Sequence, residues 1–313
     1  MKKLTEGQKM FLSVMILFLI YAIIFIVFED YDRVGLNPLD ERVDWHLLFF
    51  SIIIMGVLIF LLHRYSQKMD ERISREQAEK ENMMRRELTQ NIAHELKTPV
   101  ASILGYSETI LNNPDISEEL KHQFIERTHT QAQRLTSLLQ DISILNRIDY
   151  GSEMIEKEPV DLTKLINDTF LEVTPNLEKK QMTLTKHLPD KMQVNGNPSL
   201  LYSIFRNLFD NTINYAGEQT MIELSAVQIE GFWQFTFSDN GTGVPEEHLS
   251  RLFERFYRVD KGRSRAKGGT GLGLAIVKNA VQLHGGNISV QNRENGGLTF
   301  IFTIKKINNT ILS

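Results

Sequence analysis

A histidine followed by a carboxylate and a hydroxyl at helical spacing forms the first group of residues that could do chemistry. Glu95 directly follows His94, and Thr98 lies one helical turn further on. At about 100° per residue, His94 lies about 160° from Leu96 and about 200° from Ile92, so it points away from the apolar residues. The carboxylate can take a ring proton from the imidazole, and the hydroxyl can position a water. Standing alone, the histidine would be an ordinary surface residue.

A second group carries oxygen ligands. Asn207 and Asn211 are four residues apart, so both side chains leave one face of a helix. Their amide oxygens can join phosphate oxygens and waters around Mg²⁺, although helix capping or a polar surface would use the same residues. Asp239 ends a predicted strand and precedes Gly241 and Gly243, which allow close approach of a ligand to the backbone. Alone, this segment could be a simple turn.

A glycine-rich segment at 268–274 precedes a predicted helix at 275–284. Backbone N–H groups at such a helix start attract phosphate. A dinucleotide-binding fold also uses a glycine motif, but this one lies far from any N-terminal βαβ unit. The pair Gly296-Gly297 is a looser motif that could be only a hairpin turn. The residues of this segment expected at a bound phosphate are Gly269, Thr270, Gly271, Leu272 and Gly273.

The stretch 251–267 is cationic, with Glu254 and Asp260 as its acidic residues. A cationic loop flanked by glycines suits a lid over a triphosphate, and a solvated surface is the alternative. Its basic residues are Arg251, Arg255, Arg258, Lys261, Arg263, Arg265 and Lys267.

In this order, the segments resemble the sequence boxes of bacterial two-component sensor histidine kinases, a resemblance that covers about residues 64–306. The matching segments are 91–99 (H box), 207–215 (N box), 239–243 (first glycine box), 253–258 (F box) and 268–274 (second glycine box).

The resemblance implies roles for individual residues. His94 would be the autophosphorylation site, Glu95 the general base, and Thr98 the residue that supports phosphatase activity. Asp239 would receive the adenine amino group, and Tyr215 would lie against the nucleotide.

The implied substrate and cofactor are ATP and Mg²⁺, bound between the Asn207 helix and the lid. Arg258 is a candidate cation for the triphosphate, and Asn207 and Asn211 are the candidate metal ligands. The family often has Lys or Arg where this sequence has Asn214, so the effect of that position stays open.

The elements that position these residues begin with a helical hairpin. The apolar stripes of 88–111 and 117–148 predict two amphipathic helices, joined by a turn at Asn112–Asp115. One hairpin cannot bury both stripes well, whereas two hairpins can form a four-helix bundle. We therefore expect a homodimer and a dimerisation and phosphotransfer domain at 87–151.

A change to short strand-like runs predicts a separate α/β domain at 155–306, which the resemblance identifies as an α/β sandwich that binds ATP. Strands are predicted at 182–187, 221–227, 232–238, 287–291 and 298–305. Helices are predicted near 161–178, 198–215 and 272–284.

Two apolar runs, 10–28 and 47–62, predict a membrane region at 1–66 with transmembrane helices at about 10–28 and 45–65. The flanks are basic and the loop 29–44 is acidic, so both termini are expected in the cytoplasm. This gives a multi-pass protein of the bacterial inner membrane with cytoplasmic kinase domains. A buried core helix, or a cleavable signal peptide for the first run, is the alternative. A linker helix at 67–86 and a tail at 307–313 complete the chain.

The 313 residues suit several domains, the net charge of −4 gives no reason to expect a nucleic-acid partner, and the absence of cysteine excludes thiolate chemistry. The predicted function is ATP-dependent autophosphorylation of His94, followed by transfer to an aspartate of a response regulator receiver domain, with phosphatase activity as well. The expected partners are that receiver domain, a second copy of the chain, the lipid bilayer and an accessory membrane sensor protein. The alternatives are a gyrase- and Hsp90-like (GHKL-type) ATPase and a non-catalytic membrane scaffold.

Overall fold

The computed structural model describes residues 45–151, 155–259 and 269–307, together with the isolated positions 15, 16, 19, 22 and 23. The chain divides into two compact units, residues 1–87 and 88–313. The predicted loop at 29–44 and tail residues 308–313 lie outside the described residues, and so does most of the first predicted span at 10–28. Residues 260–268, which include the second half of the predicted lid at 251–267, also lie outside them.

In the first unit, the described backbone belongs almost entirely to the first part of helix α2 (Trp45–Asn112). Its apolar side chains, such as Ile54, Phe60 and Leu61, are exposed. By length and composition, α2 contains one segment able to cross a membrane. This agrees with one apolar span and leaves the predicted pair of spans as a proposal.

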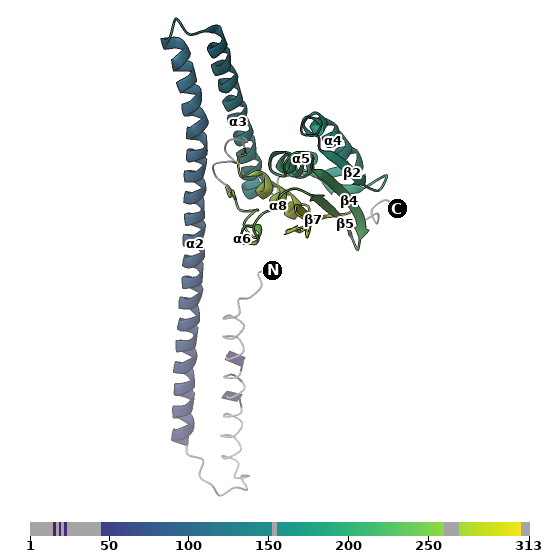
Figure 1. Ribbon diagram of the computed structural model, residues 1–313. Coiled ribbons are helices and arrows are strands. Elements are labelled where there is room, and N and C mark those ends of the chain that lie inside the picture. Colours follow the sequence, from purple (N-terminus) through teal and green to yellow (C-terminus); the bar gives the residue numbers. More distant parts are fainter. Residues whose placement is uncertain are drawn as a thin grey trace. The chain divides into compact units, whose positions relative to one another are not determined.

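In the second unit, the C-terminal part of α2 and helix α3 (Glu118–Gly151) form the predicted hairpin, with α3 running back alongside α2 (Figure 1). The hydroxyl of Ser117 accepts the backbone N–H of Leu120 at 3.3 Å, which caps the start of α3. Tyr106 and Phe124 stack with ring centroids 5.6 Å apart and tie the two helices together.

The α/β domain contains a five-stranded sheet of order β2-β4-β5-β7-β6 and a two-stranded sheet of β1 and β3. Strands β2 and β4 are parallel, and the other neighbours are antiparallel. The strands are β1 (Glu158–Asp161), β2 (Thr183–His187), β3 (Gln193–Gly196), β4 (Met221–Ile229), β5 (Phe232–Asp239), β6 (Ile288–Asn292) and β7 (Leu298–Lys305).

Helices and the large sheet share one aromatic core. In β5 and β7, alternate residues are buried, so one face of each strand packs against helices. Phe235 and Phe302 stack at 5.0 Å, and Phe205 lies edge-on to Phe235 at 5.5 Å. Each fully buried side chain of this size stabilises the fold by about 1.5–3 kcal/mol. The helices are α4 (Leu162–Lys179), α5 (Pro198–Tyr215), the short α6 (Glu246–Leu249) and α8 (Gly273–Leu283).

Candidate functional site

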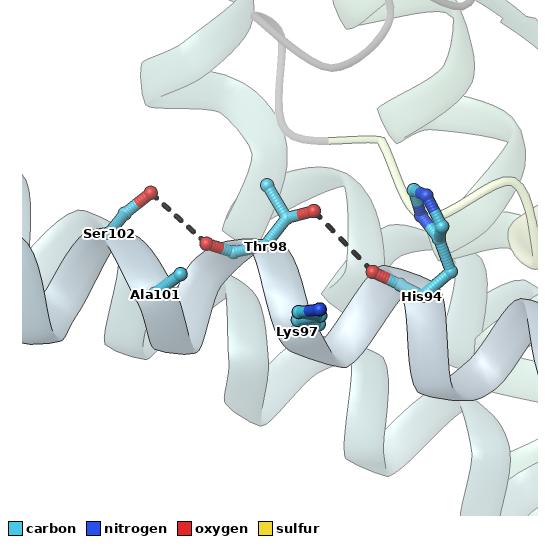
Figure 2. Close-up of a pocket in the computed structure, with 5 residues that line it drawn as sticks. All are labelled: His94, Lys97, Thr98, Ala101 and Ser102. Atoms are coloured by element: carbon cyan, nitrogen blue, oxygen red, sulfur yellow. Dashed lines mark hydrogen bonds between the residues drawn. The ribbon is translucent and has the colours of Figure 1, made fainter.

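His94 lies exposed on α2, as its angular position predicted. Figure 2 shows its ring standing clear of the helix, above a shallow hollow lined by His94, Lys97, Thr98, Ala101 and Ser102. The hydroxyl of Thr98 donates to the carbonyl of His94 at 3.4 Å, and that of Ser102 donates to the carbonyl of Thr98 at 3.1 Å. The imidazole is therefore open to a reacting group, with hydroxyls along the same side of the helix.

Glu95, next to that histidine, is held by two arginines. Nη2 of Arg258 lies 3.0 Å from Oε2 of Glu95, and Nη2 of Arg134 lies 3.5 Å from the same oxygen. The three side chains are poorly exposed, at 14% for Glu95, 6% for Arg258 and 13% for Arg134. Sequence reasoning had placed Arg258 at the triphosphate. In this structure it lies against the carboxylate beside the acceptor candidate.

Arg258 also lies beside the glycine-rich loop. A Cβ added to Gly271 would lie 3.3 Å from Nε of Arg258 and 2.9 Å from Cα of Phe256, and Gly271 has φ +75°, so this position requires glycine. Among the described residues, Nε of Arg258 is one of three buried side-chain polar atoms without a hydrogen-bond partner. A buried N–H without an acceptor costs free energy, and a phosphate oxygen in the loop would satisfy it.

The α/β domain contacts α3 through polar groups as well. Both guanidinium Nη atoms of Arg255 donate to Asp149, at 2.8 and 2.7 Å. The hydroxyl of Thr270 donates to Asp141 at 2.8 Å. Burial, with a smaller contribution from the nearby carboxylate of Asp210, raises the pKa of Asp141 to about 6 against the lowering effect of the Thr270 hydrogen bond.

Apolar side chains complete this contact between α3 and α8. Leu138 and Leu145 of α3 are buried together with Leu272 and Ile276, which belong to the glycine-rich loop and α8. Part of the stripe on the second hairpin helix is therefore covered by the α/β domain, which periodicity alone could not reveal.

The two asparagines of α5 are half-buried beside the glycine-rich loop. Nδ2 of Asn207 donates to the carbonyl of Ser203 at 2.8 Å. A Cβ on Gly273 would lie 2.6 Å from Oδ1 of Asn207, so the amide oxygen faces the start of α8. Asn211 follows one turn later on the same face.

A metal at this place would depend on few protein ligands. The described parts of the chain contain no group of three or more His, Cys, Asp or Glu residues able to hold a metal ion. Magnesium accepts one or two protein oxygens together with phosphate oxygens and water. The amide oxygen of Asn207 is compatible with that kind of site.

Asp239 is buried at the end of β5. Its Oδ1 accepts the backbone N–H groups of Gly241 at 2.9 Å and Leu298 at 3.4 Å, and its Oδ2 accepts the hydroxyl of Thr212 at 3.4 Å. Burial raises the pKa of Asp239 despite these hydrogen bonds. The carboxylate is fixed and can accept a further donor. Sequence reasoning missed Thr212, whose buried hydroxyl has no distinguishing sequence signal.

The remaining predicted residues lie around this carboxylate and the loop. Gly243 has φ +65° and lies against Asn292, which bonds both backbone groups of Val244. Tyr215 is the last residue of α5 and is 36% exposed. Asn214 is half-buried, and Gly269 is the first described residue after the lid.

The hairpin carries an exposed histidine, and the α/β domain joined to it carries asparagine, aspartate and glycine-rich elements. This combination is typical of proteins in which a histidine acceptor is coupled to a nucleotide-binding domain. Residues 84–151 match the His Kinase A (phospho-acceptor) domain, and residues 196–308 match the family described as Histidine kinase-, DNA gyrase B-, and HSP90-like ATPase. The chain belongs to the bacterial two-component sensor histidine kinases.

Among curated relatives, the sensor-like histidine kinase SenX3 of Mycolicibacterium smegmatis is 32% identical over 70% of this chain and 57% of its own length. The sensor protein kinase WalK of Staphylococcus aureus is 33% identical over 70% of this chain and 53% of its own. BaeS of Escherichia coli is 34% identical over 71% of this chain and 47% of its own length. The chain thus spans about half the length of these relatives.

Solved structures give the same fold. The histidine kinase AdeS of Acinetobacter baumannii matches 69% of this chain and 98% of its own, with TM-score 0.56 and 21% identity. The histidine kinase ThkA, in a complex with its response regulator protein TrrA, matches 70% of this chain and 61% of its own, with TM-score 0.55 and 22% identity.

Proposed function

We propose that this protein uses ATP to phosphorylate His94 and then passes the phosphoryl group to an aspartate of a response regulator. The observation that carries the proposal is the bond between Arg258 and Glu95. One guanidinium links the carboxylate beside the exposed histidine to the glycine-rich loop of the nucleotide-binding domain.

The residues of the domain divide the work of holding ATP. Asp239 accepts the adenine amino group, and the loop from Gly269 to Gly273 gives backbone N–H groups to the phosphates. Asn207 and Asn211 would hold Mg²⁺, which neutralises phosphate charge when bound. Arg258 supplies a further positive charge.

In the transfer step, a ring nitrogen of His94 forms a bond to the γ-phosphorus while the bond from that phosphorus to the bridging oxygen breaks. ADP leaves with the electron pair. Glu95 takes the proton released by the imidazole. Catalysis of this kind depends mostly on positioning and charge neutralisation.

Thr98 serves the reverse direction in this proposal, by positioning a water that attacks the phosphorylated regulator. Its place in the hollow beside His94 supports the assignment. The regulator's receiver domain would dock there, since the acceptor histidine must reach its aspartate.

The hairpin is proposed to dimerise. Apolar side chains on it, including Val100, Leu104, Ile125 and Leu139, are exposed in a single chain. A second hairpin would bury them in a four-helix bundle.

The domain division expected from the sequence is retained as a proposal, with a membrane region at 1–66, a linker helix at 67–86, a hairpin domain at 87–151 and a catalytic domain at 155–306. Two transmembrane helices and an accessory membrane sensor protein belong to the same proposal. The apolar, exposed first part of α2 supports the second span.

Radiolabelled ATP tests the function with the full chain in detergent micelles. The expected result is an acid-labile, base-stable label that is absent from His94→Gln and that requires a higher ATP concentration in Asp239→Asn. Label retained in His94→Gln would exclude this acceptor. ATP turnover without any label, unchanged in His94→Gln, would favour the ATPase alternative.

A further inference from the structure

Arg134 of α3 reaches across the hairpin to α2 and meets the carboxylate beside the acceptor histidine. Its Nη2 lies 3.5 Å from Oε2 of Glu95, and the two side chains are 13% and 14% exposed. An ion pair removed from water to this degree is screened less by salt than a surface pair. The position of Arg134 therefore influences the direction in which the Glu95 carboxylate points.

The two arginines on Glu95 come from different parts of the fold. Arg134 belongs to the hairpin that carries the acceptor, whereas Arg258 belongs to the nucleotide-binding domain. Any movement of the nucleotide-binding domain relative to the hairpin changes the distance from Arg258 to Glu95. The distance from Arg134 to Glu95 is set by the packing of α2 on α3.

Arg258 has a second interaction to make. Its buried Nε has no hydrogen-bond partner among the residues that the structure describes, and the guanidinium lies beside Gly271 of the glycine-rich loop. A triphosphate in that loop would bring strong acceptors to the same guanidinium, since phosphate oxygens bind arginine in a bidentate manner. ATP therefore competes with Glu95 for Arg258.

We propose that Arg134 is a positioning residue, which holds the Glu95 carboxylate in place for the proton of His94 when Arg258 turns to the triphosphate. The inference rests on the proposed function and extends it to a residue outside every sequence box. Arg134 itself contacts neither ATP nor the imidazole in this role. Without it, the carboxylate would sample rotamers that point away from the ring, because a glutamate side chain has three rotatable bonds.

The test measures the rate of His94 labelling against ATP concentration in the full chain, in detergent micelles. Arg134→Gln is expected to lower the maximal rate by about 10- to 100-fold, the range for a misplaced catalytic group, with the ATP concentration at half-maximal rate unchanged. Arg134→Lys is expected to recover part of the rate, since it keeps the charge. Arg258→Gln, in contrast, should both lower the maximal rate and raise the ATP concentration at half-maximal rate. Arg147→Gln, an exposed arginine on the same helix, is the matched control and should leave both values unchanged.

A double variant separates positioning from a purely structural role. In the Glu95→Gln background, Arg134→Gln is expected to cause no further loss, because the group that it positions is already gone. Equal losses with and without Glu95 would overturn the proposal, and so would a wild-type rate in Arg134→Gln. Comparable thermal midpoints confirm that the variants fold. If Arg134→Gln does not fold, Arg134→Lys takes its place in the comparison. A wild-type rate in Arg134→Lys would then overturn the proposal, and so would equal losses for Arg134→Lys with and without Glu95. Failure of the wild-type chain to label His94 would instead contradict the proposed function itself.

Discussion

Gly273 is packed so tightly against Asn207 that a Cβ on the glycine would lie 2.6 Å from the amide oxygen Oδ1. The end of the glycine-rich loop and the asparagine helix therefore touch at this point. It fixes where the amide oxygen points, toward the N-terminus of α8. The candidate phosphate-binding backbone and the candidate metal ligand are built as one unit.

Gly273→Ala is expected to weaken ATP binding by at least about tenfold, because overpacking of this kind costs about 1–3 kcal/mol and displaces the Asn207 amide. Isothermal titration of the full chain with Mg-ATP measures the change. Gly105→Ala is the control, since a Cβ there meets no atom within 4 Å. An unchanged dissociation constant for Gly273→Ala would mean that the amide oxygen does not contribute to nucleotide binding.

Asp239→Asn is expected to weaken ATP binding and to raise the stability of the fold. Loss of the carboxylate should weaken ATP binding by about 10- to 100-fold, the value of a hydrogen bond to a charged group. The pKa of Asp239 is raised by burial, so the ionised form costs stability above that pKa. The variant should therefore have a higher thermal midpoint at pH 7.5. Asp168→Asn, which changes an exposed carboxylate on α4, should alter neither property, and a lower midpoint for Asp239→Asn would refute the stability argument.

Asp141 makes the folded unit sensitive to pH. Its pKa is raised from 3.8 to about 6, chiefly by burial, so the folded chain binds a proton more tightly than the unfolded chain. Its contribution to the free energy of unfolding is complete below pH 3.8 and is lost as the pH rises through about 6. The loss is about 3 kcal/mol at most.

Asp141→Asn removes this dependence. Its unfolding free energy should match that of the wild type near pH 3.8 and exceed it at pH 7.5, as measured by denaturation at a series of pH values. Glu126→Gln changes an exposed carboxylate on the same helix and serves as the control. A constant difference between Asp141→Asn and wild type across this range would contradict the assignment.

The ion pair of Arg255 and Asp149 should contribute to docking of the α/β domain on α3. Both Nη atoms donate, and the two side chains are 29% and 27% exposed. A pair of this exposure contributes about 0.2–1 kcal/mol. Arg255→Asp or Asp149→Arg alone should speed hydrogen exchange in α8, and the double exchange should restore protection in part. Equal exchange in the single and double variants would mean that the pair does not couple the two elements.

Periodicity predicted the long elements well. The strands at β2 and β4–β7 and the helices α4, α5 and α8 lie within two residues of their predicted bounds, because each has an apolar face that the pattern displays. Strands β1 and β3 were missed. They have only four residues each, too few for an alternating pattern, and they pair with each other instead of joining the large sheet.

The candidate site was predictable only in part. Boxes of adjacent residues indicated His94, Asn207 and Asp239, since each has a local signature. Arg134 and Asp141 act through partners on other elements, at separations of 39 and 129 residues. Their position on an ordinary amphipathic helix carries no local signal of those contacts.

Pro99 weakens the backbone hydrogen bonding of α2 beside the acceptor histidine. It has no N–H to donate to the carbonyl of Glu95, while the carbonyls of His94 and Thr98 each receive a hydroxyl. A twist or bend entering the helix would deform most where its hydrogen-bond ladder is weakest. The histidine thus lies in the turn where α2 lacks one backbone hydrogen bond, so a bend in this turn would alter the direction of its ring.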